Sequence, residues 1–356
     1  MRGHRDDKNA SAVVVDCVYD ETMVNTRNLL LPAAMARAGW DLLVKRADVH
    51  AVPFDMDTSI DAFRALLADV EGVALINTPL GESDIQAGPR LRVVARHGVG
   101  YDMVDVAALT RRGILLMVTA DANSTSVAEQ AVYFMMALAK RGAAFNAMVR
   151  EHRWHDRWCE ERPAELLGKT VVVVGFGRSG TRVARLSLAL GMTVRVYDPY
   201  VDPAAMAAAG CVPESDLDAA LPYADFVTLH CPKTTETLSM FDAARLARMK
   251  PTAYLVNTAR GGIIDQHALH AALTAGVIRA AALDVFDREP PAPDDPLLKL
   301  PNVIAAPHMA GVTTEAFDRM STGVADNLLS VLDGRPRVEN VVNREVLARF
   351  GARPPT

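Results

Sequence analysis

Short apolar runs alternate with helical patterns along most of the chain. Residues 170–174 read Thr-Val-Val-Val-Val, a continuous apolar run with the length of a strand buried on both faces. We expect further strands at residues 12–18, 73–77, 92–96, 114–118, 193–197, 226–229, 253–256, 280–285 and 303–306. Two successive blocks of strands alternating with helices predict an α/β fold of two lobes, each with a parallel sheet and helices on its faces.

Helical patterns lie between these runs, and glycines follow several of them. We expect helices at residues 25–38, 104–112, 127–140 and 314–332. Gly39, Gly113 and Gly334 stand where the first, second and last of these helices should stop. The helix at residues 127–140 is apolar almost all round, so we expect it to be buried on most sides, with N-cap oxygens supplied by residues 123–126.

Residues 150–163 interrupt this rhythm. The segment carries Trp154 and Trp158 among many charges, which indicates an arm or loop that packs on another surface, such as a second subunit. We expect His152 and His155 in this segment to be solvated rather than to bind a metal. Residues 347–356 are expected to form a frayed tail.

Composition narrows the class of protein. A length of 356 residues suggests two domains, and a net charge of -5 without a basic block excludes a typical nucleic-acid or anionic-membrane binder. The four cysteines suit neither a zinc site nor a disulfide framework. The polar start resembles no signal peptide, and no run approaches the ~20 apolar residues of a membrane span. We therefore expect a soluble cytoplasmic protein with reduced thiols and no metal.

A glycine turn follows the four valines and opens a helix, which is the context of a dinucleotide-binding turn. Gly175 permits the tight turn, Gly177 lets the backbone approach a pyrophosphate, and Gly180 lets the helix lie close to the strand. The free N–H groups and the helix dipole near Arg178 and Ser179 should then bind the anion.

Asp198 ends the next expected strand, 18 residues past Gly180. A carboxylate there accepts hydrogen bonds from the ribose hydroxyls and repels a 2′-phosphate, which predicts NAD rather than NADP. A plain glycine turn with a capping aspartate is the alternative, and the agreement of strand, turn, helix and acid argues against it.

Three residues with complementary chemistry follow separate strands. Arg260 has the planar fork that matches a carboxylate, and His308 titrates near neutral pH as an acid/base must. Glu289 can orient the histidine and stabilise its charged form. Each is ordinary alone, but strand ends of a parallel sheet meet at one edge, so together they suggest hydride transfer to or from a small 2-hydroxy acid.

With these features the chain resembles the D-isomer-specific 2-hydroxyacid dehydrogenase family over residues 73–332. The motifs that carry the resemblance are residues 96–102 (Arg-His-Gly-Val-Gly-Tyr-Asp), 126–129 (Ser-Val-Ala-Glu), the glycine turn 175–180, 230–232 (His-Cys-Pro), 257–261 (Asn-Thr-Ala-Arg-Gly), 282–286 (Ala-Leu-Asp-Val-Phe) with 289–290 (Glu-Pro), and 307–311 (Pro-His-Met-Ala-Gly).

The resemblance implies a role for each matching position. Arg260 would bind the substrate carboxylate and keto oxygen, while His308 would be the acid/base paired with Glu289. Backbone N–H groups of Val99 and Gly100 would hold the carboxylate from the other lobe. The implied cofactor contacts are Asp284 on the nicotinamide carboxamide, and Cys231, Pro232, Thr258, Ala259 and Gly311 along the adenosine and nicotinamide sites.

The resemblance also implies a domain order and an assembly. Both lobes would be Rossmann-like or flavodoxin-like, and an NAD-binding Rossmann domain at residues 121–309 would be inserted into a discontinuous substrate domain formed by residues 1–120 and 310–345, with a tail at 346–356. Such proteins are usually homodimers that pack through the cofactor domain, which suits the tryptophan arm.

Residues 75–79 depart from the phosphoglycerate dehydrogenases of this family, which carry an arginine shortly after the matching strand. The chain has no cation there and no room for an added regulatory domain, so we expect a substrate other than 3-phosphoglycerate, with Asn77 and Thr78 as polar contacts. Glyoxylate, hydroxypyruvate, a branched 2-keto acid and a sulfonated analogue stay open.

Two other functions fit the same fold. An NAD-sensing corepressor that binds peptides would keep the cofactor turn, and the Arg-Glu-His set does not exclude it. A formate dehydrogenase would lack a glutamate paired to the histidine, and Glu289 argues against that alternative.

Overall fold

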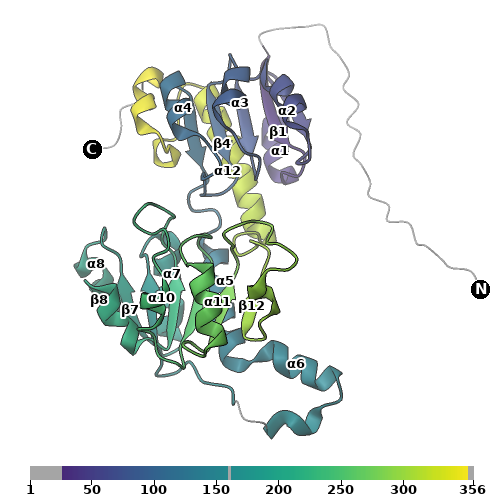
Figure 1. Ribbon diagram of the computed structural model, residues 1–356. Coiled ribbons are helices and arrows are strands. Elements are labelled where there is room, and N and C mark those ends of the chain that lie inside the picture. Colours follow the sequence, from purple (N-terminus) through teal and green to yellow (C-terminus); the bar gives the residue numbers. More distant parts are fainter. Residues whose placement is uncertain (1–25, 159–161, 352–356) are drawn as a thin grey trace, which may run out of the picture.

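A computed structural model describes residues 26–158 and 162–351 of the chain. Figure 1 shows two lobes, each built on a sheet whose strands are all parallel. This confirms the predicted α/β fold with two parallel sheets. The strand expected at residues 12–18 lies outside the described residues.

The first lobe has five strands in the order β2-β1-β3-β4-β5, which is the flavodoxin-like order. Its strands are β1 (Arg27–Pro32), β2 (Val49–Phe54), β3 (Gly72–Leu75), β4 (Val93–Arg96) and β5 (Leu115–Val118). Its helices are α1 (Arg37–Val44), α2 (Ile60–Leu67), α3 (Glu82–Ala87) and α4 (Val106–Arg112). The core of this lobe lies on both faces of the sheet.

The second lobe has seven strands in the order β12-β11-β10-β9-β6-β7-β8, so the strand order reverses between β6 and β9 as in a Rossmann fold. Its strands are β6 (Thr170–Val174), β7 (Thr193–Tyr197), β8 (Val212–Glu214), β9 (Phe226–Leu229), β10 (Tyr254–Asn257), β11 (Ala280–Leu283) and β12 (Val303–Ala305). Its helices are α5 (Ser124–Lys140), α6 (Gly142–Arg150), α7 (Arg178–Ala189), α8 (Pro203–Ala208), α9 (Leu217–Ala220), α10 (Ala243–Leu246) and α11 (Gln266–Thr274), with 3-10 turns η1 (Trp154–Trp158), η2 (Leu221–Tyr223) and η3 (Pro296–Lys299).

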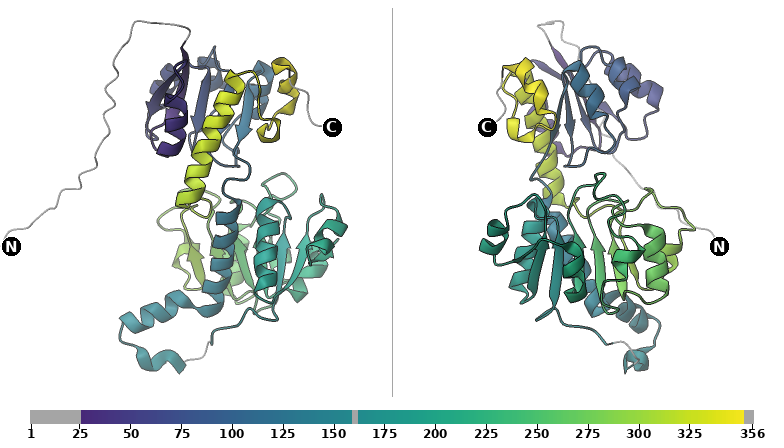
Figure 2. Two further views of the ribbon diagram at one scale, coloured as in Figure 1. Left: turned by 180° about the vertical axis from the view of Figure 1, so that it is seen from behind. Right: turned by 60° about the vertical axis from the view of Figure 1, so that its left-hand side comes forward.

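Helix α12 (Thr314–Leu332) joins the lobes, and η4 (Val338–Asn340) and η5 (Arg344–Phe350) follow it. Figure 2 shows α12 running from the second lobe onto the first, where its apolar side chains enter the core beside β1, β3 and β4. The C-terminal helix therefore returns to the lobe that holds the N-terminal strands.

The helix expected at residues 25–38 is wrong, because the structure has strand β1 there and begins α1 at Arg37. Leu29, Leu30 and Leu31 are fully buried between β2 and β3, and an uninterrupted apolar run carries no period that separates a strand from a helix. Gly39 does not stop a helix either. It lies inside α1, where a Cβ would meet the backbone oxygen of Ser321 at 2.4 Å, so glycine lets α1 and α12 pack closely.

Helix α5 exposes a single stripe, which includes Tyr133 (58% exposed) and Met136 (38% exposed), and it is buried or half-buried elsewhere, as expected. Two further expectations need correction. The pattern of the sequence did not predict strands β2 and β8. Most of their residues are half-exposed or exposed, so neither strand forms a clear apolar run in the sequence. Leu347 does not lie in a frayed tail, because η5 buries it completely in the first lobe.

The segment after α5 extends from the second lobe as helix α6 and turn η1 (Figure 1). Trp154 is 58% and Trp158 78% exposed, and the Arg157 guanidinium lies over both rings. Such exposed aromatic area suits an interface. The homodimer expected through this arm stays a prediction.

His97 joins β4 to α12 and is buried. Its Nε2 lies 3.0 Å from the Ser321 hydroxyl oxygen, and its ring packs on Phe317. Burial lowers the pKa of His97 to about 4. Because the unfolded pKa lies near 6.5, the unfolded chain binds more protons between these values, and the stability conferred by neutral His97 is lost as the pH falls from about 6.5 toward 4.

Between pH 7.5 and pH 5 the free energy of unfolding should fall less in His97→Gln than in the parent chain. The difference between the two falls should reach up to about 2 kcal/mol. The reason is that glutamine has no proton to take up on unfolding. Urea titrations at both pH values measure the free energy of unfolding. His155→Gln makes the same substitution at an exposed site and serves as the control, which should keep the pH dependence of the parent chain. An unchanged pH dependence in His97→Gln would contradict this assignment.

Candidate functional site

The glycine turn lies between β6 and α7, where the strand order reverses and ligands of doubly wound sheets bind. Gly175 has φ +95°, and a Cβ there would lie 2.7 Å from the backbone nitrogen of Cys231. A Cβ on Gly180 would lie 1.9 Å from the Gly175 oxygen, whereas one on Gly177 would meet nothing within 4 Å. Two glycines are therefore needed by the fold, and the third faces open space.

Helix α7 begins at Arg178, so its first N–H groups, including that of Ser179, lie at this turn. The Arg178 side chain pairs with Asp121 at 2.8 Å, which ties the helix start to the segment that precedes α5. An anion at the turn would meet the positive end of the helix dipole.

Asp198 follows β7, and the backbone holds its carboxylate. One oxygen accepts the Phe176 N–H at 2.7 Å and the other accepts the Tyr200 N–H at 2.9 Å. A carboxylate oxygen has two lone pairs, so each can still accept from a ligand hydroxyl.

Cys231 and Pro232 follow β9 on the other side of β6, and burial raises the pKa of the Cys231 thiol to about 11. That thiol is protonated at neutral pH, as expected for a packing residue.

His308 and Glu289 meet after strands β12 and β11. The His308 Nδ1 lies 2.6 Å from Oε2 of Glu289, and Oε1 of the same glutamate accepts the Phe286 N–H at 3.0 Å. Burial raises the pKa of Glu289, but the hydrogen bonds from His308 and Phe286 and the charge of Arg260 outweigh it and leave the pKa below its usual value. Glu289 is therefore ionised at neutral pH, and the His308 Nε2 is left for a ligand.

Asp284 anchors the loop that carries His308. Its two oxygens accept the N–H groups of Met309 and Ala310, both at 2.8 Å, and its own backbone oxygen accepts the His308 N–H. Burial raises the pKa of Asp284 and these two N–H donors oppose the shift. The observed contacts give it a positioning role, and its expected contact with a carboxamide stays a prediction.

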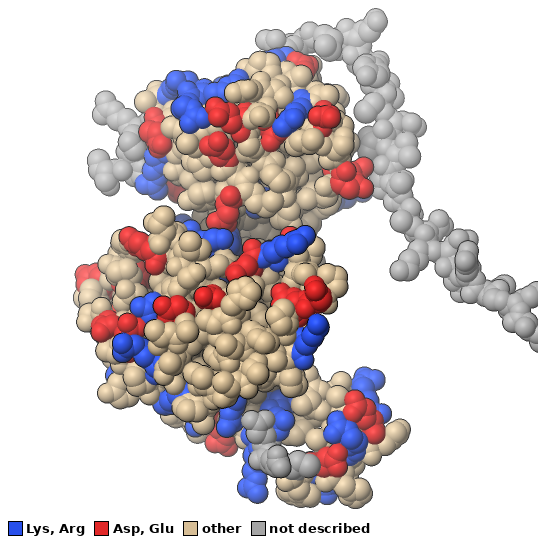
Figure 3. All heavy atoms as spheres, in the orientation of Figure 1, with Lys and Arg blue, Asp and Glu red and all other residues tan. Residues whose placement is uncertain are grey.

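Arg260 reaches across from the second lobe to the first. Its Nε donates to Oδ2 of Asp102 at 2.9 Å and its Nη1 to the Ala259 oxygen at 2.7 Å. Gly100 makes room for it, since a Cβ there would lie 1.8 Å from the Arg260 Nη2. The side chain of Asn257 holds the loop by bonding the backbone at Ala259 and Arg260. Arg260, Glu289 and Asp102 therefore belong to one cluster between the lobes, where Figure 3 shows a recess.

The first lobe contributes a second guanidinium. Arg96 donates to the backbone oxygens of Gly100 and Leu75, at 2.7 and 3.0 Å, which shapes the loop that carries Val99 and Gly100. Burial, with the charge of Arg260, lowers the pKa of Arg96 to about 10, so it remains charged at neutral pH.

The remaining residues expected to contact a ligand lie in loops at the same ends of the two sheets. Asn77 is exposed after β3, and the buried hydroxyls of Thr78 and Thr258 have no hydrogen-bond partner among the described residues. No hydrogen bond among these residues joins Asn77 or Thr78 to Arg260. Gly311 packs so closely on Asn123 that a Cβ would lie 2.6 Å from its side-chain nitrogen.

Asp102 is the site residue that sequence reasoning missed. It stands in the motif at residues 96–102, but nothing in the pattern indicates a partner 158 positions away. Arg96 and Asp284 likewise have observed contacts that the sequence did not predict. For Arg96 and Asp284 the available signal was a charged residue at the end of an apolar strand.

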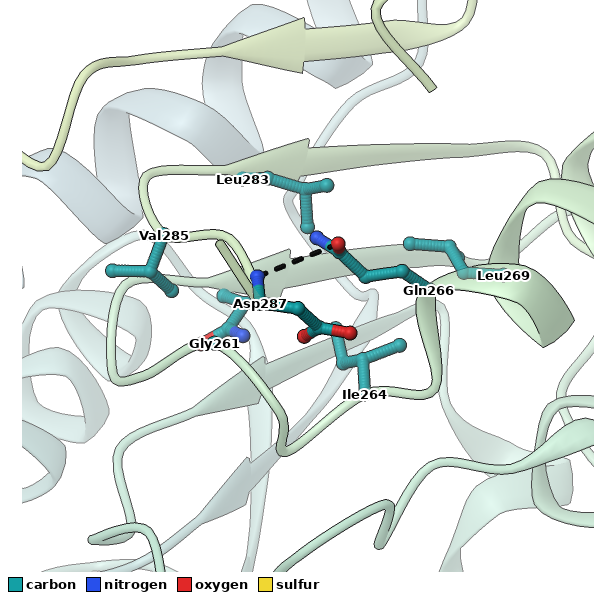
Figure 4. A pocket seen from close by; sticks show the side chains of 8 residues that line it. Gly261, Ile264, Gln266, Leu269, Leu283, Val285 and Asp287 are labelled. Atoms are coloured by element: carbon teal, nitrogen blue, oxygen red, sulfur yellow. Dashed lines mark hydrogen bonds between the residues drawn. The ribbon is translucent and has the colours of Figure 1, made fainter. Parts of the chain in front are cut away.

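A narrow gap lies behind the Arg260 loop, too small for a water molecule (Figure 4). Its lining residues are Asn257, Gly261, Ile264, Gln266, Leu269, Leu283, Val285 and Asp287. The Asp287 N–H donates to Gln266 at 3.4 Å across it. Arg260, Glu289 and His308 do not line this gap.

The described residues offer neither a metal site nor a membrane-spanning helix. Within residues 26–158 and 162–351, no group of three or more His, Cys, Asp or Glu side chains could hold a metal ion. No helix in these ranges combines the length and the apolar character needed to cross a membrane.

Known proteins resemble this chain in sequence and structure. The sequence profile described as "D-isomer specific 2-hydroxyacid dehydrogenase, NAD binding domain" matches residues 132–310. A D-3-phosphoglycerate dehydrogenase of Mycobacterium tuberculosis is 42% identical over 295 residues, which cover 80% of this chain and 55% of that protein. A glyoxylate reductase of Korarchaeum cryptofilum is 41% identical over 288 residues, covering 80% of this chain and 84% of the relative. This chain thus spans about half the length of the phosphoglycerate dehydrogenases that it matches.

A solved structure shares the two-lobe arrangement. The NADPH-dependent glyoxylate/hydroxypyruvate reductase of Sinorhizobium meliloti, in complex with NADP and malonate, superposes with a TM-score of 0.79 at 29% identity. The match covers 90% of this chain and 97% of that one.

The glycine turn yields a test of its packing. Gly180→Ala should lower the free energy of unfolding by about 1–3 kcal/mol because the new Cβ overlaps the Gly175 oxygen. Gly177→Ala should stay within about 0.5 kcal/mol of the parent chain, since its surroundings are open. Equal thermal unfolding midpoints for the two variants would contradict this geometry.

Proposed function

Because this chain belongs to the D-isomer specific 2-hydroxyacid dehydrogenase family, we propose that it interconverts a small D-2-hydroxy acid and its 2-keto acid with NAD as cofactor. The observation that carries the proposal is the His308–Glu289 hydrogen bond of 2.6 Å, formed beside Arg260 at the strand ends of the second lobe. A guanidinium, a base and an orienting acid in one recess are what this reaction needs.

The glycine turn fits the pyrophosphate of a dinucleotide. Gly177 leaves open space at the N-terminus of α7, and the backbone orients Asp198 one strand away. Asp198 would accept hydrogen bonds from the ribose and repel a 2′-phosphate, which favours NAD over NADP. We assign cofactor binding to residues 121–309, and substrate binding to residues 1–120 with 310–345.

The side chains divide the chemistry between them. The cofactor, once held by the glycine turn and Asp198, would supply the hydride for C2 of the keto acid. Arg260 binds the carboxylate and polarises the keto oxygen, while His308 donates a proton from Nε2 to that oxygen and takes it back in the reverse direction. Glu289 fixes the imidazole through Nδ1 and stabilises its charged form until the proton moves.

The polar groups of the first lobe support a small unphosphorylated acid as the substrate. The backbone N–H groups of Val99 and Gly100 would hold the carboxylate opposite Arg260, with Asn77 and Thr78 nearby on the same sheet edge. The loop after β3 carries no cation at residues 76–79, which favours an unphosphorylated acid over 3-phosphoglycerate. One relative is named a D-3-phosphoglycerate dehydrogenase and the other a glyoxylate reductase. The acids tested should therefore include phosphorylated and unphosphorylated ones.

We expect NADH oxidation by the purified chain with at least one acid among glyoxylate, hydroxypyruvate, a branched 2-keto acid and 3-phosphohydroxypyruvate. His308→Ala should lower kcat on that acid by roughly 10²–10⁴-fold because the proton donor is lost. Absorbance of NADH at steady state measures both. Turnover near that of the parent chain in His308→Ala would rule out the proposed role, and no turnover on any acid would favour a binding protein.

The Asp102–Arg260 contact predicts a positioning effect. Asp102→Ala should raise KM for the acid by roughly tenfold while leaving KM for NADH unchanged, because Arg260 loses the partner that aligns its fork. Asp102→Asn, which keeps an acceptor for Nε, should recover part of the loss. If both variants instead raised KM for NADH by the same factor, the change would be a general structural defect and not a misaligned Arg260.

A further inference from the structure

A side-chain contact crosses the glycine turn. Tyr200 lies in the loop after β7 and Glu236 in the loop after β9, and the Tyr200 phenol donates a hydrogen bond to Oε2 of Glu236. Strand β6 lies between β7 and β9 in the sheet, so this contact spans the end of the strand that carries the turn. Tyr200 is 78% exposed, hence the hydrogen bond rather than burial orients its ring.

The loop that carries Glu236 is held by its own hydrogen bonds. The Thr237 hydroxyl donates to the Pro232 oxygen at 2.7 Å and accepts the Thr234 N–H at 2.7 Å. The Glu236 N–H in turn donates to the Thr234 hydroxyl at 3.2 Å. The backbone thus positions this carboxylate on the side of the turn opposite the loop that carries Asp198.

Two carboxylates act on the same phenol. The hydrogen bond to Glu236 raises the pKa of Tyr200, and the charges of Glu236 and Asp198 add to it, so the phenol stays protonated and donates to Glu236. Within the described parts of the chain, no Lys or Arg forms an ion pair with Asp198 or Glu236. The adenosine end of the site therefore carries two negative charges without a paired cation.

We propose that Glu236, oriented by Tyr200, is a second specificity residue that acts with Asp198 to exclude the 2′-phosphate of NADPH. The proposal rests on the proposed cofactor site. A 2′-phosphate carries about −1.5 to −2 charges at neutral pH. It would extend from the ribose beside Asp198 and meet Glu236 across the turn, whereas the uncharged 2′-hydroxyl of NADH would not be repelled. In water-like surroundings, one added charge at an assumed separation of about 7 Å would weaken phosphate binding roughly three- to tenfold.

The test measures binding directly, so it needs no knowledge of the substrate. Calorimetric titrations of the full chain with NADH and NADPH, at low salt, compare the parent chain with Glu236→Gln. We expect the Kd for NADPH to fall roughly three- to tenfold and the Kd for NADH to stay within about twofold. Adding about 0.5 M salt should remove most of the difference, because the charges are exposed and screened.

Two further variants separate charge from contact. Glu345→Gln makes the same charge change on an exposed residue of the first lobe and should leave both Kd values unchanged. Tyr200→Phe breaks the hydrogen bond but keeps the carboxylate, so its effect on NADPH should be smaller than that of Glu236→Gln.

The outcomes distinguish this inference from the proposed function. Tight NADH binding with an unchanged ratio of the two Kd values in Glu236→Gln would overturn the role of Glu236 and leave the cofactor site standing. A parent chain that binds NADPH as tightly as NADH would also overturn it. Failure to bind either nucleotide would overturn both proposals.

Discussion

All strands of both sheets run parallel, and that constraint decides where the reactive side chains meet. The carboxyl ends of β10, β11 and β12 lie at one edge, so Arg260, Glu289 and His308 meet there although up to 48 residues separate them. The corresponding edge of the first sheet carries the loop with Gly100 and Asp102. Because the two edges face each other, a side chain from one lobe can pair with a carboxylate from the other.

Buried polar groups hold these strand-end loops in place. His308 has φ +56°, a left-handed conformation that costs about 1–2 kcal/mol in a residue with a Cβ. The Asp284 carboxylate stabilises that loop through two backbone N–H groups just beyond His308. Asn257 does the same for the loop that carries Arg260. A rigid backbone keeps the imidazole and the guanidinium oriented before any ligand arrives, which lowers the entropic cost of binding.

The charges of the recess divide into two regions. The guanidiniums of Arg96 and Arg260 face the carboxylates of Asp102 and Glu289, so a proton on His308 would leave one positive charge for an anionic substrate. At the other end, Asp198 and Glu236 flank the glycine turn with negative charge. Opposite potentials at the two ends would favour a small acid beside Arg260 and an unphosphorylated ribose beside Asp198.

Local pattern predicted much of this molecule. The valine run, the glycine turn and the acid after the next strand are recognisable because strand burial and tight turns impose their requirements on neighbouring residues. The same local reasoning misassigned residues 27–32, since Leu29 to Leu31 satisfy a helix and a strand equally until flanking strands cover both faces. It also assigned Gly39 to a helix stop, when the close approach of α12 requires it.

The amino-acid sequence by itself determined the fold class, the dinucleotide turn and the residue types of the site, because backbone geometry and side-chain chemistry are properties of short segments. Only the tertiary structure decided which polar side chains are paired. The bond from Arg260 to Asp102 and the contact of Tyr200 with Glu236 join residues 158 and 36 positions apart. Hydrogen bonds act over about 3 Å, so such partners exist only once the folded strands have brought their loops together.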